Sequence, residues 1–214
     1  MERESFLRRV REATSRATLP PHPEDDPGLL VPALPEVDLV EHFTRVLTAT
    51  DGIVHRNDPR EALAEISRRL PAGPYLCWDE VADVAAVLDA EGRERLDAEV
   101  PADAAGRHRH QSDYADAVIG VTSAEAGLAE SGTIVVRSGP GRPRMASLVP
   151  EVHVALLQVG DLHRSLVHWA EHAAGSIPDA ANLVFITGPS RTGDIEQQLN
   201  LGVHGPRELH VVLI

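Results

Sequence analysis

The chain has 214 residues, 43% of them hydrophobic and 25% charged, a composition typical of a soluble globular protein with one domain, or one domain and an arm. Its 33 acidic and 20 basic residues give a formal net charge of −13, which argues against binding to nucleic acid or to an anionic membrane. All the basic residues are arginine and the only cysteine is Cys77, so lysine Schiff-base chemistry, an internal disulfide and a four-cysteine metal or iron–sulfur site are excluded.

The N-terminal region is predicted to be a helix followed by an arm. Apolar positions near helical spacing predict a helix over residues 2–17, and six prolines predict a loop or extended arm over residues 19–36. We therefore divide the chain into a helix with a Pro-rich arm, residues 1–36, and an α/β domain, residues 37–214. No apolar segment approaches the roughly 18 residues of a membrane span, and the N-terminus lacks the apolar core of a signal peptide. We expect a cytoplasmic protein.

From Val37 onward, helices and short strands alternate. Helices are predicted at 37–50, 59–70, 79–92, 161–175 and 191–202, and strands at 53–56, 74–78, 115–122, 132–138, within 150–160, at 182–188 and at 208–214. Residues 123–131 are predicted to be a short helix or loop, and residues 93–113 give no clear prediction. The pattern favours an α/β fold with a mostly parallel sheet and helices on both faces. Strands lie close together between residues 116 and 157, so part of the sheet is expected to be antiparallel.

Three segments beside predicted strands combine Gly-Pro with arginine. They are residues 139–142 and 188–191, each after a strand, and residues 205–207 before the last strand. Glycine lets a ligand approach the backbone, proline stiffens the turn, and arginine offers a planar fork of donors to an anion. Free N–H groups at a helix start beginning at Ser190 favour the same ligand. These segments are therefore either a site for a carboxylate or phosphate, or tight turns with solvated arginines.

Three acidic residues near these segments are candidates for chemistry. Glu130 lies between a small-residue segment and a strand, where a carboxylate can act as nucleophile, base or ligand, or can be an exposed helix end. Asp194 and Glu196 follow the turn at 188–193. They either contact a substrate or a metal, or complement the dipole of a first helical turn.

Histidines give a weaker signal. His163, His168 and His172 fall near i, i+4 spacing on the predicted helix 161–175, an arrangement that can bind a metal. The glutamate of an HExxH motif is absent, so we predict no metal site. His204, beside residues 205–207, is the histidine that we expect to contact a ligand.

Two long segments resemble the lactate-utilisation (LUD) domain family, and within it the lactate utilisation protein C group. They are "ADAVIGVTSAEAGLAESGTIVVRSGPGRPRMASLVPEVHV", residues 115–154, and "ITGPSRTGDIEQQLNLGVHGPRELHVVLI", residues 186–214. The resemblance is carried by the motif AE(S/T)GT followed by a strand and SGPG, and by TGPS, DIE and GVHGP in that order. Residues 1–112 carry little of it.

The resemblance implies a fold, a reaction and partners. The family fold is a Rossmann-like α/β sheet, similar to that of CoA transferases and ribose-phosphate isomerases. Family members act with iron–sulfur partner proteins in the oxidation of L-lactate to pyruvate, so we expect no cofactor in this chain and place the clusters in iron–sulfur lactate-utilisation subunits. Class I CoA transferases use a glutamate near a Glu-x-Gly motif. Glu130-Ser131-Gly132 is similar, which makes Glu130 the candidate catalytic residue.

These inferences combine into one expected pocket for a small carboxylate, in which the C-terminal segment faces Glu130 and the loop at 138–144. The residues expected to bind substrate are Thr133, Ser138, Gly139, Gly141, Arg142, Thr187, Gly188, Ser190, Arg191, Thr192, Asp194, Glu196, His204 and Arg207. Two other functions stay open. The chain is alternatively a stand-alone CoA-transferase or isomerase-like enzyme that uses Glu130, or a carboxylate-binding module that regulates lactate metabolism.

Overall fold

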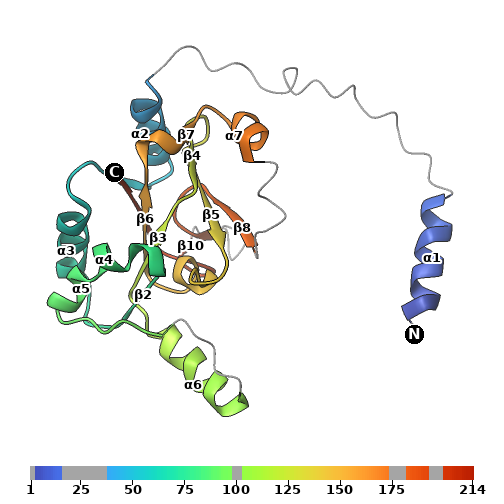
Figure 1. The fold of residues 1–214 in the computed structure, drawn as a ribbon, viewed down its shortest axis with the longest axis horizontal. Coiled ribbons are helices and arrows are strands. Elements are labelled where there is room, and N and C mark those ends of the chain that lie inside the picture. Colours follow the sequence, from blue (N-terminus) through green and yellow to red (C-terminus); the bar gives the residue numbers. More distant parts are fainter. Residues whose placement is uncertain (1–2, 16–37, 98–102, 174–181, 193–199) are drawn as a thin grey trace. The chain divides into compact units, whose positions relative to one another are not determined.

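The computed structural model of the chain describes residues 3–15, 38–97, 103–173, 182–192 and 200–214 (Figure 1). Contacts divide the chain into two units, Met1–Ala33 and Leu34–Ile214. In the first unit, the predicted N-terminal helix is present as α1 (Arg3–Ser15). The Pro-rich arm lies outside the described residues. Among the helices of the described part, none is long and apolar enough to cross a membrane.

The second unit is built on the parallel sheet that the sequence predicts. Its strands lie in the order β1 (Ile53–His55), β11 (Glu208–Leu213), β6 (Val152–Leu157), β3 (Ile119–Ser123) and β2 (Tyr75–Cys77), and all neighbours are parallel. Every residue of the inner strand β6 is buried, because both faces of this sheet are covered.

Helices cover one face of the central sheet. Figure 1 shows α3 (Pro59–Arg69), α4 (Ala82–Ala85) and α5 (Val87–Ala90) on the same side of it. The side chain of Asp58 accepts hydrogen bonds from the amides of Arg60 and Glu61 and so caps α3. The single helix predicted over residues 79–92 is instead a 3-10 turn, Asp79–Val81, followed by the short helices α4 and α5.

The other face is covered by α2 (Leu39–Ala49) and by a second sheet. This sheet has the order β7 (Leu162–His163), β4 (Ala126–Leu128), β5 (Thr133–Ser138) and β8 (Asn182–Ile186). The pairs β4–β5 and β5–β8 are antiparallel. The first of them lies within residues 116–157, where part of the sheet is expected to be antiparallel. Helix α7 (Leu166–Ala173) packs on its outer side through the buried Trp169.

Strand β4 contradicts the prediction of a helix or loop over residues 123–131. Ala126 and Leu128 of β4 pack with Trp169, whereas Ala129, the residue after the strand, joins the central core. At Gly127, an added Cβ would lie 2.6 Å from Leu162 and 2.7 Å from Leu157. The small residues are therefore present because two layers approach closely here, not because a helix requires them.

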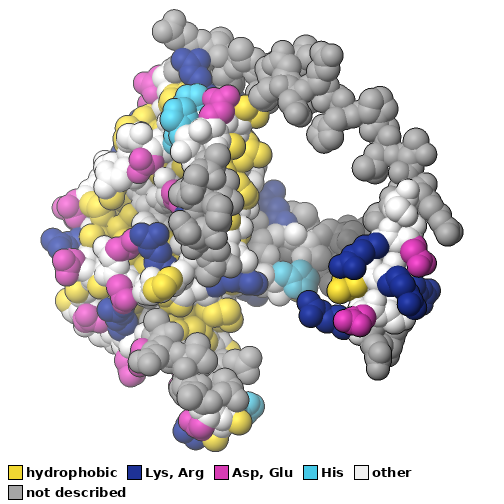
Figure 2. Space-filling view, turned by 45° about the vertical axis from the view of Figure 1, so that its right-hand side comes forward, with side chains coloured by type: hydrophobic (Ala, Val, Ile, Leu, Met, Phe, Trp, Pro, Cys, Tyr) yellow, Lys and Arg dark blue, Asp and Glu magenta, His cyan; other side chains and the backbone are white. Residues whose placement is uncertain are grey.

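The remaining elements connect the layers. Helix α6 (Ala104–Ala115) forms in the segment without a clear prediction, and Asp103 caps it. Two 3-10 turns, Arg144–Ser147 and Val159–Asp161, flank β6. A helix is predicted over residues 191–202, but the two ends of this segment are strands. They are β9 (Arg191–Thr192) and β10 (Asn200–Leu201), which pair as a two-stranded antiparallel ladder. Basic and acidic side chains are interspersed over the face shown in Figure 2.

Two histidines are buried inside the central sheet. His153 on β6 bonds through Nε2 to Thr122 Oγ1 at 2.9 Å, and its Nδ1 has no hydrogen-bond partner among the described residues. Burial lowers the pKa of His153 to about 3. His210 on β11 contacts Nε2 of His55 at 2.8 Å, and burial also lowers its pKa. Both rings are therefore neutral at pH 7.

The stability of the chain is expected to fall as the pH decreases, in part because of His153. The unfolded chain binds a proton here below about pH 6.5, whereas the folded chain does so only near pH 3. Between these values the free energy of unfolding falls as the pH is lowered, by on the order of 3 kcal/mol from pH 7 to pH 4. In urea titrations across this range, His153→Gln should lose most of this slope. The exposed His108→Gln should keep it, and an unchanged slope in His153→Gln would contradict the assignment.

Candidate functional site

The residues that the sequence analysis assigns to one pocket lie at opposite ends of β5. Thr133 begins this strand and Ser138 ends it, a separation of about 17 Å for a strand of six residues. The structure therefore does not bring Glu130 and Thr133 to face the loop at 139–142. One group of candidates lies at the carboxyl ends of the central strands, and the others lie at their amino ends.

The first group lines a pocket of about 500 Å³ beyond the carboxyl ends of β2 and β3, where α/β sheets commonly bind ligands. Its lining residues are Asp79, Glu80, Arg137, Ser138, Gly139, Pro140, Gly141 and Arg142. Four of these, Ser138, Gly139, Gly141 and Arg142, are predicted substrate-binding residues. The structure thus joins one predicted motif to acidic residues that come directly after β2.

The loop at 139–142 is a tight turn that is anchored to the segment after β2. The amide of Gly139 donates to the carbonyl of Arg142 at 3.1 Å, and the amide of Arg142 donates back at 2.9 Å. Gly141 has φ of 68°, in the left-handed region that favours glycine. Its carbonyl accepts from the amide of Asp79 at 3.0 Å, and Trp78 Nε1 donates to the carbonyl of Pro143 at 3.0 Å. These bonds hold the loop over the sheet edge.

Charged side chains in and beside the pocket form pairs. The guanidinium of Arg142 bonds to Glu80 and lies 5.7 Å from the centre of the Trp78 ring. Glu80 also accepts a hydrogen bond from Ser123 at the end of β3. The side chain of Arg142 is 39% exposed and that of Glu80 is 33% exposed. A partly exposed Arg–carboxylate pair can exchange its anion for a ligand carboxylate of the same geometry. The pair is therefore accessible to a small acid.

A second pair is better shielded. Arg137 on β5 donates two hydrogen bonds to Glu125, and their side chains are 13% and 27% exposed. Separating a shielded pair would leave each charge without its partner, so the two side chains hold one another in place. The pair therefore stabilises the wall of the pocket. Arg95 bonds to Asp79 at 2.9 Å and so restrains the other acidic lining residue.

The sequence analysis missed Asp79, Glu80, Glu125 and Arg137. The signal for Asp79 and Glu80 was present, because they directly follow the predicted strand 74–78, and polar residues beyond the carboxyl end of a parallel strand face the ligand edge. The neighbouring Cys77 is buried, and burial raises the pKa of its thiol to about 11. A thiol in this state is a core residue and not a nucleophile.

The second group of candidates lies where α2 turns into β1. The hydroxyl of Thr133 contacts that of Thr187 at 2.8 Å and that of Ser131 at 2.7 Å. At Gly188, an added Cβ would lie 2.8 Å from the carbonyl oxygen of Thr50. Here the predicted anion site packs against the protein's own backbone.

Arg191 has partners in this second group. Its guanidinium donates to the carbonyl oxygen of Thr50 at 2.7 Å and pairs with Asp51. Asp51 itself adopts a positive φ of 62° in the turn before β1. Arg191 therefore ties the loop after β8 to the α2–β1 turn.

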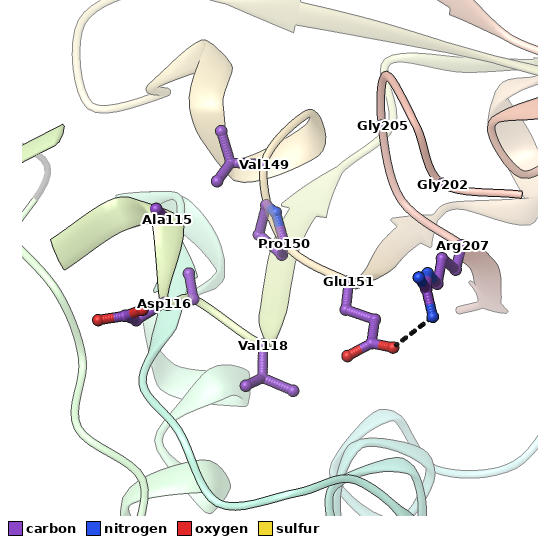
Figure 3. Close-up of a pocket in the computed structure, with 10 residues that line it drawn as sticks. Ala115, Asp116, Val118, Val149, Pro150, Glu151, Gly202, Gly205 and Arg207 are labelled. Atoms are coloured by element: carbon purple, nitrogen blue, oxygen red, sulfur yellow. Dashed lines mark ion pairs between the residues drawn. The ribbon is translucent and has the colours of Figure 1, made fainter. Parts of the chain in front are cut away.

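The third group surrounds a pocket of about 360 Å³ at the amino ends of β3, β6 and β11 (Figure 3). Arg207 and Glu151 point toward one another across its opening, with 3.7 Å between the guanidinium and the carboxylate. The amide of Ser190 donates to the carbonyl of Pro206 at 2.9 Å, which places the two Gly-Pro segments side by side.

The other predicted residues contribute less. His204 is exposed, and Thr192 pairs with Asn200 in the β9–β10 ladder. Glu130 is exposed at the end of β4, and its amide donates to the carbonyl of Arg164 at 3.0 Å. Asp194 and Glu196 lie outside the described residues.

Comparison with known proteins identifies the relatives of the chain. Residues 40–214 match the family model of the LUD domain. Lactate utilization protein C of Geobacillus sp. (strain WCH70) is 31% identical over 167 residues, which cover 72% of this chain and 68% of that protein. Lactate utilization protein C of Exiguobacterium sp. is 40% identical over 100 residues, covering 45% and 44% of the two chains.

A solved structure has a similar fold. The crystal structure of a DUF162 family protein from Deinococcus radiodurans superposes with a TM-score of 0.58, covering 82% of this chain and 95% of that chain. The two sequences are 18% identical, so this likeness shows the fold alone.

The turn at 139–142 allows a matched test of its geometry. In Gly141→Ala, the new Cβ would lie 2.7 Å from the Asp79 carboxylate, which can rotate away, but the positive φ would remain strained. We expect a loss of about 1 kcal/mol in the free energy of unfolding, measured by urea titration. Gly139→Ala should be nearly neutral, because its Cβ meets nothing within 4 Å. Equal effects of both variants would contradict this description of the loop.

Proposed function

Because the chain belongs to the LUD domain family, we propose that it is a lactate-utilisation subunit that acts with iron–sulfur partner proteins in the oxidation of L-lactate to pyruvate. The support for a lactate-utilisation role comes from the relatives named lactate utilization protein C, which match this chain at 31% and 40% identity. The reaction and the partners are part of the proposal: they are what the family resemblance implies, and the chemistry of this chain's residues is consistent with them.

The observation that carries the proposal is the pocket at the carboxyl ends of β2 and β3. Arg142 presents a partly exposed guanidinium there, held between Glu80 and the face of Trp78. We propose that the carboxylate of lactate replaces Glu80 on Arg142 through paired N–H···O bonds. Glu80, released from that pair but still close to Ser123, would then accept a hydrogen bond from the lactate hydroxyl. A pocket of about 500 Å³ has room for a three-carbon acid.

The electron balance of the reaction supports the expectation of partners. Oxidation of lactate breaks the C–H and O–H bonds at C2 and releases two protons and two electrons. A carboxylate such as Glu80 can accept a proton, but a side-chain carboxylate does not accept electrons. With one cysteine, the chain cannot ligate a cysteine-bound iron–sulfur cluster by itself. The electrons would therefore pass to clusters in the partner proteins.

Binding of lactate to the purified chain tests the pocket. We expect Arg142→Gln to weaken the binding of L-lactate or pyruvate by about 10- to 100-fold, measured by isothermal titration calorimetry, because a charge-assisted hydrogen bond is lost. Arg144→Gln is the matched control, since Arg144 is exposed in the next turn and does not line the pocket. It should bind like the wild type.

Other outcomes of the same titration separate the alternatives. Lactate binding that is kept in Arg142→Gln and lost in Arg191→Gln would move the site to the amino ends of the strands. Binding of a CoA thioester but not of lactate, with turnover abolished in Glu130→Gln, would favour the stand-alone CoA-transferase function instead.

Association with partners is tested separately. We expect the chain to co-elute with the iron–sulfur lactate-utilisation proteins of the same organism in size-exclusion chromatography under anaerobic, reducing conditions. The mixture should oxidise L-lactate in the presence of an electron acceptor, and the chain alone should not. Failure to co-elute, or full activity of the mixture without this chain, would contradict the role as a subunit.

A further inference from the structure

The absence of an HExxH glutamate leads to the prediction of no metal site, but the geometry of the histidines argues otherwise. We propose that His163, His168 and His172 form a binding site for a divalent transition-metal ion, for which zinc is a suitable candidate. One ring nitrogen from each histidine lies within 4.8 Å of the others. The site lies apart from the carboxylate pocket, and its existence does not depend on the proposed function.

The backbone brings these residues together from two elements. His163 ends β7, where it pairs with Leu128 of β4, and its carbonyl accepts from the amide of Ala129 at 2.8 Å. The predicted helix over residues 161–175 therefore begins later than expected, at Leu166. His168 and His172 lie one turn apart on this helix, α7, so their side chains share a face.

Helix α7 is fixed in its rotation about its own axis. Trp169 is buried against β4 and β5 and meets Phe185 edge-on, with 5.5 Å between the ring centres. The amide of His168 donates to Ser165 Oγ at 3.2 Å, which caps the helix start. Because Trp169 points inward, His168 and His172 are held on the exposed side, toward His163.

The distances fit a metal coordination sphere. The Nδ1 atoms of His163 and His168 are 3.2 Å apart. Two nitrogens bound to the same tetrahedral zinc ion lie about 3.3 Å apart, since each Zn–N bond is about 2.05 Å. The third ring is close to both, with 5.8 Å between the ring centres of His163 and His172 and 4.8 Å between those of His168 and His172. His163 is half-buried, whereas the rings of His168 and His172 are exposed and free to rotate toward a shared ion.

The hydrogen bond of His172 orients its free nitrogen. Its Nδ1 lies 2.7 Å from the carbonyl oxygen of His168, so Nδ1 carries the proton and donates it. The lone pair is then on Nε2, which is the nitrogen that a metal ion would bind. Metal-binding histidines commonly donate their other N–H to a carbonyl or carboxylate in this way.

The ligand atoms and their exposure suit a transition-metal ion. Imidazole nitrogens suit zinc, nickel and copper and are poor ligands for magnesium. Since His168 and His172 are exposed, water can reach a fourth coordination position. Figure 2 shows histidine side chains at the surface of the face that it presents.

The test is zinc binding to the untagged full chain, measured by isothermal titration calorimetry and by the shift in Tm. We expect one equivalent of Zn²⁺ to bind and to raise the Tm, and Mg²⁺ at the same concentration to do neither. The double variant His168→Ala/His172→Ala should weaken zinc binding by about tenfold or more and lose the rise in Tm. His163→Ala should do the same.

A matched control uses a histidine elsewhere on the chain. His108→Ala should bind zinc like the wild type, because His108 is exposed on α6 and does not belong to the triad. Far-UV circular dichroism without metal should be unchanged in His168→Ala/His172→Ala and in the control, since the substituted residues are exposed. The proposal is overturned if the wild type takes up no zinc, or if a folded His168→Ala/His172→Ala protein binds it with wild-type affinity.

Discussion

The arrangement of the site depends on the close approach of two layers of backbone, which only glycine permits. At Gly120 on β3, an added Cβ would lie 1.8 Å from the carbonyl oxygen of Ala146, and at Gly132 it would lie 2.5 Å from the backbone of Leu47. No side-chain rotation relieves a clash with backbone. The close approach at Gly120 places the segment after β5 against the central sheet. The close approach at Gly132 places the start of β5 against α2. As a result, β5 runs from α2 to the carboxyl end of β2, and Arg142 meets Glu80.

Much of the fold could be predicted from the sequence, because its signals are local. The apolar runs that became β2, β5, β6 and β11, and the caps Asp38 and Asp58, depend on nearby residues alone. The errors occur where packing decides. Residues 126–128 form a strand because Gly127 lets Leu162 approach. Arg93 is buried because it donates to the carbonyls of Ser67, Pro71 and Gly73 at the end of α3, a role that no spacing reveals.

The candidate site was only half predictable for a related reason. The sequence identifies turns that combine glycine with arginine, but it does not show which arginines have a partner that a ligand can replace. Arg191 donates to the carbonyl oxygen of Thr50, and removing that bond would leave a backbone group without its partner. Arg142 instead pairs with a carboxylate that has a second partner, Ser123. An anion can displace Glu80 from Arg142 without stranding the displaced group, so Arg142, unlike Arg191, combines accessibility with an exchangeable partner.

The hairpin of β4 and β5 also separates two kinds of chemistry. At the Ser138 end, arginine and carboxylate groups face a polar pocket. Near the other end, the amide of Glu130 bonds to Arg164, the residue after His163, so the histidine triad lies beside this end of the hairpin. A three-carbon acid cannot span the length of β5, about 17 Å. A metal ion held by the triad would therefore not touch lactate bound at Arg142. It would instead stabilise the β7–α7 connection or take its fourth ligand from another molecule at this exposed surface.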